Sequence, residues 1–242
     1  MDLIETFDQR LRAAANGSAP GAELLPERLA QATAETLRAD GAGISMVFAV
    51  RRRLPLGASS GDAADAERLQ FTLGDGPCLH VHDTGDPVAV GEDELRERWP
   101  AFHEELTSRT PFRSVVSAPL FGELHGVGAI DLLFRQPQVP EQLPYADTVR
   151  VTYAVGEHLR QGHQRGVDDG PAWLDAPQAR RRSRVWQAIG FVNSGLEVTS
   201  TDALALLRAH AFSSGLLLDD LAERVLDRRV PLAELADPAA SP

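Results

Sequence analysis

The side chains with the clearest chemical potential gather around a single cysteine. Cys78 follows a turn-forming run, Gly74-Asp75-Gly76-Pro77, and His80 and His82 come soon after it. A cysteine at the start of a helix can have a lowered pKa and act as a redox-sensing thiol, whereas a small buried apolar residue is the alternative interpretation. The two histidines would share one face of a strand and could there ligate a metal or haem, but on a helix they would diverge by about 200°. Ordinary loop or surface histidines are the alternative interpretation for both.

Catalytic chemistry finds little support in the residue pattern. Cys78 is the only cysteine, which excludes an intrachain disulfide and a cysteine-based zinc cluster. Asp131 lies in a β-rich run and is predicted to face inward, where it would line a sensor pocket with Cys78 and His80. No Ser/His/Asp constellation or carboxylate pair stands out. We therefore predict no catalytic residues, no metal site and no enzyme activity, and the residues identify no cofactor.

The basic residues are all arginine. The chain of 242 residues has 24 basic and 35 acidic side chains, a net charge of −11, and lacks lysine, which excludes chemistry that needs a lysine amine. Residues 1–172 carry a net charge of −10 and residues 173–242 a net charge of −1. The densest basic cluster is Arg180, Arg181, Arg182 and Arg184. If the chain contacts a polyanion, we expect the contact in this last third.

Helices and strands are mixed over the first two thirds of the chain. Apolar periodicity and turn residues predict an opening helix carrying Leu3, Phe7 and Leu11, a second helix that ends near 40–41, a strand at 44–50, a turn at 51–55, a short exposed helix at 62–69, a strand at 87–90, a helix that begins at Pro100, a hairpin of 113–120 and 124–134, and a helix that begins at Pro144. Strands joined by hairpins among helices predict an α+β domain with a mostly antiparallel sheet.

The last third of the chain has a different pattern. A segment rich in Gly, Asp and Pro predicts a linker at 164–177, after a first domain at 1–163. Three amphipathic stripes predict an all-α bundle at 178–235, with Ser200 as the N-cap of its second helix, and residues 236–242 read as a flexible tail. Apolar runs fall short of the roughly 18–20 residues of a membrane helix. The first residues lack the basic start of a secretory signal, so a cytoplasmic protein without membrane contact is predicted.

Ordered motifs between residues 25 and 160 resemble the GAF domain family, in the subtype found in bacterial two-domain regulators. The motifs are Gly74-Asp75-Gly76-Pro77-Cys78, Gly85-Asp86-Pro87-Val88, Trp99-Pro100-Ala101-Phe102, the run 112–120 and the run 126–132. The resemblance implies a GAF-like antiparallel sheet with flanking helices and a small-molecule ligand in a sensor pocket.

The C-terminal segment resembles the ANTAR family, a three-helix RNA-binding module of transcription antiterminators. The resemblance rests on the runs 184–190, 203–208 and 218–222. It implies RNA contacts through Arg180, Arg181, Arg182, Arg184, Gln187 and Arg208. Two positions depart from the family pattern: Ile189 stands where a lysine is usual, and Leu204 stands where an aromatic residue is usual. RNA affinity depends on cations and stacking aromatics, so these departures weaken the expectation of RNA binding.

Three functional hypotheses follow from these residues. The first is a signal-responsive antitermination regulator, in which a GAF domain senses an unidentified input and an ANTAR domain binds RNA hairpins. The second is a protein-interaction or dimerisation regulator whose ANTAR-like bundle has lost RNA binding. The third is a ligand or redox sensor without nucleic-acid output. A homodimer is expected in each case through the terminal helices at 1–15 and 144–162, because Leu3, Phe7 and Leu11 have few obvious contacts in so short a helix.

Overall fold

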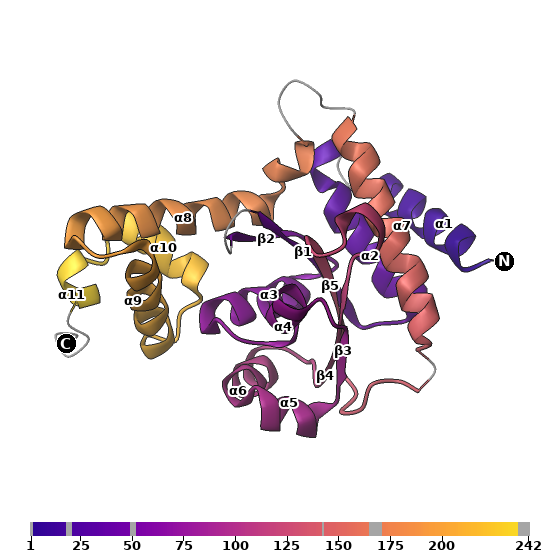
Figure 1. Cartoon of the computed structure of the whole chain (residues 1–242), viewed down its shortest axis with the longest axis horizontal. Coiled ribbons are helices and arrows are strands. Elements are labelled where there is room, and N and C mark those ends of the chain that lie inside the picture. The colour runs from indigo at the N-terminus through magenta and orange to yellow at the C-terminus, as the bar shows by residue number, and fades with distance from the viewer. Residues whose placement is uncertain (1, 18–20, 49–51, 142, 165–170, 237–242) are drawn as a thin grey trace.

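A five-stranded sheet lies at the centre of the molecule. The computed structural model describes residues 2–17, 21–48, 52–141, 143–164 and 171–236. The strands are β1 (Gly41–Phe48), β2 (Arg52–Ala58), β3 (Val88–Val90), β4 (Ser114–Pro119) and β5 (Gly128–Phe134). Their order in the sheet is β2-β1-β5-β4-β3, with antiparallel neighbours throughout (Figure 1). The predicted antiparallel α+β domain is confirmed.

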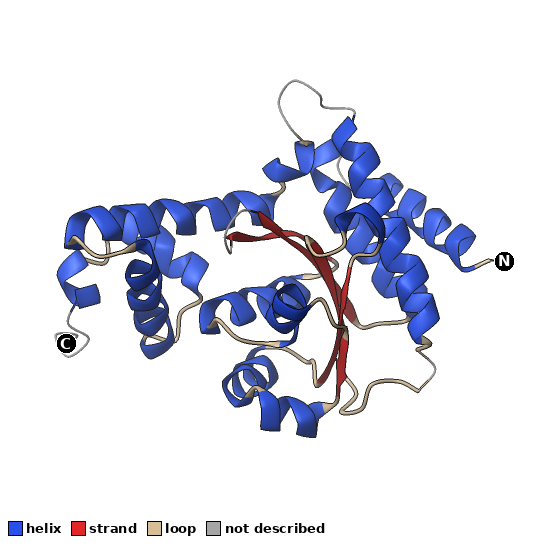
Figure 2. Ribbon diagram, in the orientation of Figure 1, coloured by secondary structure: helices blue, strands red, loops and turns tan. Residues whose placement is uncertain are grey.

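Helices cover both faces of this sheet (Figure 2). One face carries α1 (Leu3–Gly17), α2 (Leu25–Leu37) and α7 (Tyr145–Gln164), and the other carries α3 (Gly61–Leu73), α4 (Pro77–Thr84), α5 (Glu92–Arg98) and α6 (Pro100–Arg109). Short 3-10 turns occur at Ala22–Leu24, Gly122–Leu124 and Ala172–Asp175. The helical domain comprises α8 (Pro177–Leu196), α9 (Ser200–Ser213), α10 (Leu218–Leu226) and α11 (Leu232–Ala236). It lies beside α3, on the side of the sheet away from α1 and α7 (Figure 1).

Alternation along the strands gives the sheet one apolar face and one partly polar face. Ala42, Ile44 and Met46 of β1 point into the core that α1, α2 and α7 cover. The intervening Ser45 points to the opposite face, toward α4. Because side chains alternate with a period of two, the same rule places polar residues of β2, β4 and β5 on that second face. The candidate site is built there.

The two domains exchange apolar side chains at their junction. Phe71 of α3 is buried in the core of the helical domain, together with Val185 and Leu207. In return, Leu217, the residue before α10, is buried in the core beneath α3 and α6. Each core therefore contains a residue from the other domain, and neither is complete alone.

Several predicted elements differ from the structure. The turn predicted at 51–55 is largely strand β2, because Arg53, Pro55 and Gly57 disguise an alternation in which Leu54 and Leu56 face the core. The helix predicted as short and exposed at 62–69 is the longer α3, which is covered by the sheet on one side and by the helical domain on the other. The N-cap of α9 is Thr199, whose hydroxyl accepts the backbone N–H of Asp202 at 3.1 Å, and not Ser200.

Two further expectations concern segments between and beside the domains. Within the predicted linker at 164–177, Trp173 is buried in the core under α1, α2 and α7, and residues 165–170 lie outside the described residues. Phe7 is buried in that same core, so the opening helix finds its apolar contacts within one chain and does not need a second copy for them. Leu3 and Leu11 pack against it. The predicted tail lies outside the described residues beyond Ala236.

The exchanged phenylalanine yields a stability prediction. Phe71→Ala should lower the free energy of unfolding by about 3–5 kcal/mol, because it removes a fully packed ring from the helical domain's core. The matched control is Phe212→Ala, whose ring is 57% exposed and whose loss should cost about 0.5 kcal/mol or less. Urea unfolding followed by circular dichroism measures both. Equal, small losses for the two variants would show that the domains do not share a core.

Candidate functional site

Asp131 is the centre of a cluster of polar side chains, here called the inner network, on the sheet face that α3 and α4 cover. It is 4% exposed, and Ser117 lies directly opposite it on the neighbouring strand. The Ser117 hydroxyl donates to Asp131 Oδ1 at 2.5 Å, and the Gln70 amide of α3 donates to Oδ2 at 2.8 Å. The same Gln70 accepts the backbone N–H of Cys78 at 2.8 Å. Burial raises the pKa of the Asp131 carboxyl, against the opposing effect of the nearby Arg53 cation.

Ser45 connects this group to α4 and β2. Its hydroxyl lies 3.4 Å from Cys78 Sγ and 3.0 Å from His82 Nε2, and it accepts from Arg53 Nε at 3.4 Å. Burial raises the pKa of the Cys78 thiol well above its ordinary value. Burial and the Arg53 charge lower the pKa of His82 to about 3. The thiol is therefore protonated and the imidazole neutral at pH 7.

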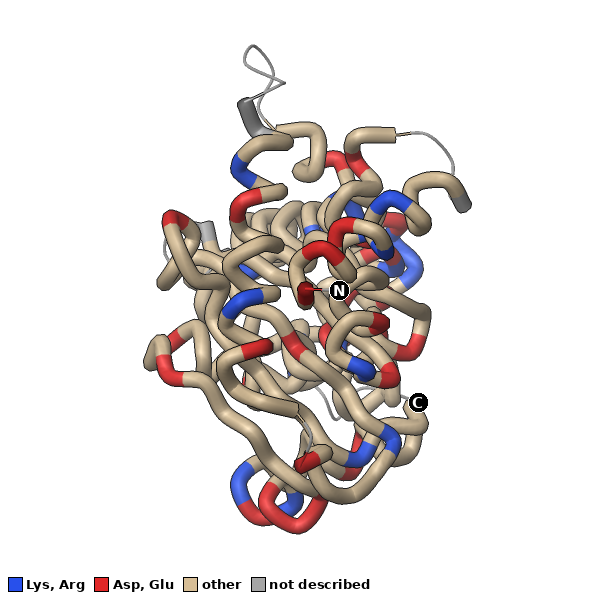
Figure 3. Tube along the Cα trace, turned by 90° about the vertical axis from the view of Figure 1, so that its right-hand side faces the viewer, with Lys and Arg blue, Asp and Glu red and all other residues tan. Residues whose placement is uncertain are grey.

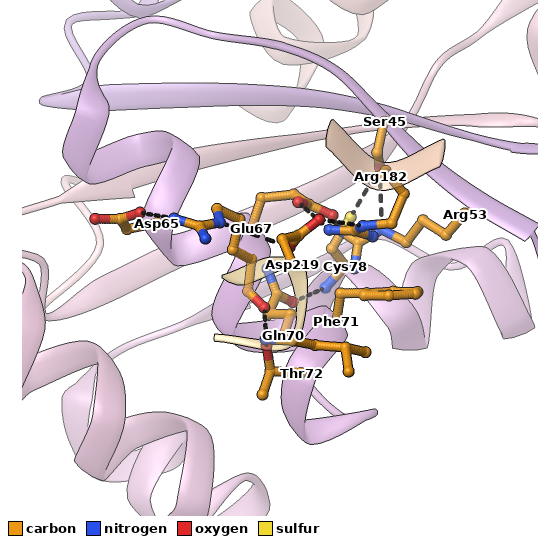
Figure 4. A network of polar contacts seen from close by, with 12 residues as sticks. Ser45, Arg53, Asp65, Glu67, Gln70, Phe71, Thr72, Cys78, Arg182 and Asp219 are labelled. Carbon is orange, nitrogen blue, oxygen red and sulfur yellow. Dashed lines mark hydrogen bonds and ion pairs between the residues drawn. The ribbon is translucent and has the colours of Figure 1, made fainter. Parts of the chain in front are cut away.

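A fully buried arginine extends the network into the helical domain (Figure 4). Arg182 of α8 is 0% exposed. It donates from Nη2 to Glu67 Oε2 of α3 at 2.9 Å and from Nε to Asp219 Oδ1 of α10 at 3.1 Å. Its guanidinium carbon lies 3.5 Å from the centre of the Phe71 ring. Because the other oxygen of Glu67 lies 3.6 Å from Arg53 Nη2, ionic contacts continue from the sheet to α10.

Helix α3 also holds the start of α10. Arg68 pairs with Asp220 at 2.5 Å and lies 3.5 Å from Asp219. The hydroxyl of Thr72 accepts the backbone N–H of Leu218 at 2.9 Å, which satisfies a donor in the first turn of α10. One helix of the sheet domain therefore provides both the ionic and the capping contacts of its neighbour.

An open cleft of about 990 Å³ lies between the two domains, next to this network. The sheet domain contributes Val47, Arg53, Phe71, Gly74, Leu79, His82 and Asp83 to its lining, and the helical domain contributes Trp186, Ile189, Gly190, Ser200, Thr201, Leu204, Ala205 and Arg208. Its volume falls in the range of small-molecule sites.

The three residues predicted to line a sensor pocket are divided by the structure. Cys78 and Asp131 lie in the inner network. His80 lies outside it, with its ring 6.0 Å from that of Trp99, and His82 is the histidine that enters the network. The reason is that both histidines lie on helix α4, where side chains two positions apart point to nearly opposite sides of the helix.

The residues predicted to contact RNA are also divided. The prediction that Arg182 contacts RNA is wrong for this structure, because the side chain is buried in ion pairs and does not reach the surface. Arg208 packs against the sheet domain, where its Nε donates to the carbonyl of Phe71 at 3.1 Å. Arg180, Arg181, Arg184 and Gln187 remain at least partly accessible on α8, with Arg180 close to Asp175 and Arg184 close to Asp227.

Sequence reasoning missed most of the residues that build this junction. They are Ser45, Arg53, Glu67, Gln70, Phe71 and Asp219. Glu67 and Gln70 are three apart on one helix and point inward, a pattern that resembles an exposed polar face until the opposing domain is known.

The described residues contain neither a membrane-spanning helix nor a metal cluster. None of their helices combines the length and apolarity needed to cross a membrane, and they contain no cluster of three metal-binding side chains.

The environment of Cys78 predicts an unreactive thiol. The residue is 1% exposed and its thiol is protonated, so a disulfide reagent at neutral pH should modify the native protein only through transient opening. The same reagent on the urea-unfolded chain gives the rate for an accessible thiol, and that rate should be much higher. Rapid modification of the native protein would favour the redox-sensor hypothesis instead.

Comparisons with known proteins agree on the sheet domain. Among solved structures, this chain is similar to the GAF domain of a phosphoenolpyruvate-protein phosphotransferase from Coxiella burnetii, with 13% identity, a TM-score of 0.49 and coverage of 69% of this chain and 99% of that one. It is also similar to the phycocyanobilin-bound GAF domain of a cyanobacterial phytochrome, with 13% identity, a TM-score of 0.46 and coverage of 68% and 97%. No curated protein matches the chain. The GAF domain model matches residues 23–149, more than half of the chain, and the protein therefore belongs to the GAF domain family.

Proposed function

We propose that the protein is a signal-responsive regulator and not an enzyme. In this proposal the GAF domain senses a small molecule in the cytoplasm, as GAF domains commonly bind small ligands, and the helical domain carries the output. The observation that supports it is the ionic connection from Arg53 on the sheet, through Glu67 and Arg182, to Asp219 in the helical domain. A ligand that contacts Arg53 would change the charge beside Glu67 and so act on the contacts that hold the helical domain.

The output that the ANTAR-like residues favour is RNA hairpin binding and, through it, transcription antitermination. The accessible residues Arg180, Arg181 and Arg184 form one basic stretch of α8, close to Gln187. Arg208 and Leu204 line the cleft against the GAF domain, so that part of the proposed RNA surface is covered. On the side that carries the N-terminus, acidic and basic positions are interspersed (Figure 3), which does not favour a polyanion there. The arrangement described here is therefore the low-affinity state in this proposal.

Salt titration of RNA binding tests this output. Changing Arg180, Arg181 and Arg184 together to Ala should remove up to three phosphate contacts, each worth roughly 0.7–0.9 in the slope of log affinity against log salt. The slope should flatten by about two to three while the urea midpoint stays the same. Changing three exposed arginines of the GAF domain, Arg12, Arg96 and Arg135, is the matched control. Equal slopes for the two triple variants, or no measurable RNA binding, would contradict an RNA output through α8.

A second candidate output is binding to another protein. Ile189, at the position where ANTAR domains usually have a lysine, is 6% exposed and lies in the helical domain's core and at the cleft. The rings of Phe191 and Phe212 are exposed at 37% and 57% on the same domain. These features favour apolar contact over phosphate contact. Absence of RNA binding by the unchanged protein, together with loss of its binding to a partner protein on Phe191→Ser, would support this candidate.

We also propose that the protein is a homodimer, through the surface of α7. Tyr145 and Tyr153 are 55% and 56% exposed on that helix, an unusual exposure for large rings. Light scattering should give a mass near twice the 26.2 kDa of one chain, and Tyr153→Ser should shift it toward one chain. A single-chain mass for the unchanged protein at micromolar concentration would contradict the dimer.

A further inference from the structure

The cleft between the domains contains one cationic group that lacks an anion among the described residues. Arg208 of α9 makes no ion pair with a carboxylate among the described residues. It donates to the Phe71 carbonyl, and its guanidinium carbon lies 5.3 Å from the centre of the Phe71 ring. Burial, followed by repulsion from Arg182, lowers the pKa of Arg208 to about 10. A guanidinium in this position is therefore less well stabilised than one in water, and an anion beside it would correct that.

A second guanidinium reaches the cleft from the GAF domain. Arg53 is 2% exposed and lines the cleft, yet its Nη1 has no hydrogen-bond acceptor among the described residues. Its Nη2 has only the 3.6 Å ionic contact to Glu67, beyond hydrogen-bonding distance. Buried arginine donors are seldom left without an acceptor, so these atoms point to a ligand.

The other titratable groups around the cleft do not supply the missing charge. Among the described residues that line the cleft, Asp83 is the one with a carboxylate, and its side chain is exposed at the rim. His82 is neutral at pH 7, because burial and Arg53 lower its pKa to about 3. The acidic groups nearby are already in contact with other groups: Glu67 and Asp219 are bound to Arg182, and Asp131, which acts on Arg53, accepts from Ser117 and Gln70. Arg208 is therefore left without a carboxylate partner among the described residues.

The rest of the lining is apolar and comes from both domains. Leu79 and Phe71 face it from the GAF domain, and Trp186, Ile189 and Leu204 face it from the helical domain. A few polar groups set in an apolar wall are typical of a site for a small molecule that has an apolar body. Inorganic phosphate alone would leave most of the cleft unfilled.

We propose that this cleft binds an amphipathic anion, a small molecule with an aromatic or aliphatic body and one carboxylate, sulfonate or phosphate group that pairs with Arg208, while Arg53 lines the same cleft from the GAF domain. The proposal deepens the sensor function above and rests on it. Because one arginine belongs to each domain, the bound anion holds the domains together. It also keeps Leu204 and Arg208 covered, so by linkage it lowers the affinity of the helical domain for any partner that needs these residues.

Two dyes of nearly the same shape test the proposal. The anionic probe is 8-anilinonaphthalene-1-sulfonate, and the neutral probe is N-phenyl-1-naphthylamine, which has the same ring system without the sulfonate. The folded wild-type protein should bind the anionic dye at least roughly tenfold more tightly, since a charge-assisted hydrogen bond favours it. Equal affinities, or no binding of either dye by the native protein, would overturn the proposal.

Substitutions locate the anion. Arg208→Gln should weaken the anionic dye by roughly tenfold or more and leave the neutral dye unchanged. The matched control is Arg109→Gln, because Arg109 also bonds across the domain junction, to the carbonyl of Gly215 at 3.0 Å, but lies outside the cleft. This control should bind both dyes as the wild type does. An Arg208→Gln protein that keeps the preference for the anionic dye, or an Arg109→Gln protein that loses it, would overturn the assignment.

A second variant covers the case in which Arg208→Gln unfolds the junction. Leu204→Glu places a carboxylate at a half-buried position of the cleft and should abolish the anionic dye's advantage, with near-ultraviolet circular dichroism confirming the fold. If the advantage persists in this folded variant, the anion does not lie in the cleft. Both dye measurements are made without RNA, so failure of RNA binding and failure of the anion site are separate results.

Discussion

The burial of Arg182 is the constraint on which the rest of the structure depends. Removing a guanidinium from water costs several kcal/mol unless its donors meet well-placed acceptors. Here the acceptors come from two places that lie far apart in the sequence, Glu67 of the GAF domain and Asp219 of the helical domain. The ring of Phe71 completes the enclosure, 3.5 Å from the cation. Neither domain alone can satisfy this charge, and the exchange of Phe71 and Leu217 between the two cores follows the same logic.

Because of this constraint, the domains are either fully in contact or fully separated, and intermediate arrangements are unfavourable. Separating the domains would remove Glu67 from Arg182 and would expose Phe71 to water, so a partly opened junction is unfavourable. A signal that acts on Arg53 changes the charge beside Glu67 and therefore acts on the pair that holds α8. The coupling needs no long conformational pathway, because Arg53, Glu67 and Arg182 are consecutive members of one buried ionic chain.

The elements that could be predicted from the sequence are those with a visible local pattern. Helices α1, α2 and α7 each bury one face and show it as apolar periodicity, whereas β4 and β5, which are buried on both faces, show as two apolar runs around a turn. Helix α3 is covered on two sides, so its polar residues at Glu67 and Gln70 read as solvent-exposed although both are buried. Arg182 was predicted to face RNA for a related reason. A basic cluster shows its charge in the sequence, but which member finds buried acids depends on residues 115 and 37 positions away.

Most of the candidate site escaped prediction because no single segment contains it. The glycine-rich turn before Cys78 illustrates this. Gly74 adopts a φ of 76° at the end of α3, a conformation that favours glycine, and a Cβ there would lie 2.7 Å from Arg208 Nη1. The turn resembles a local GAF signature, yet the absence of a side chain at Gly74 is also what lets an arginine of the other domain lie against α3. A residue that ends α3 therefore also shapes the cleft, and its second role becomes visible only when both domains are in place.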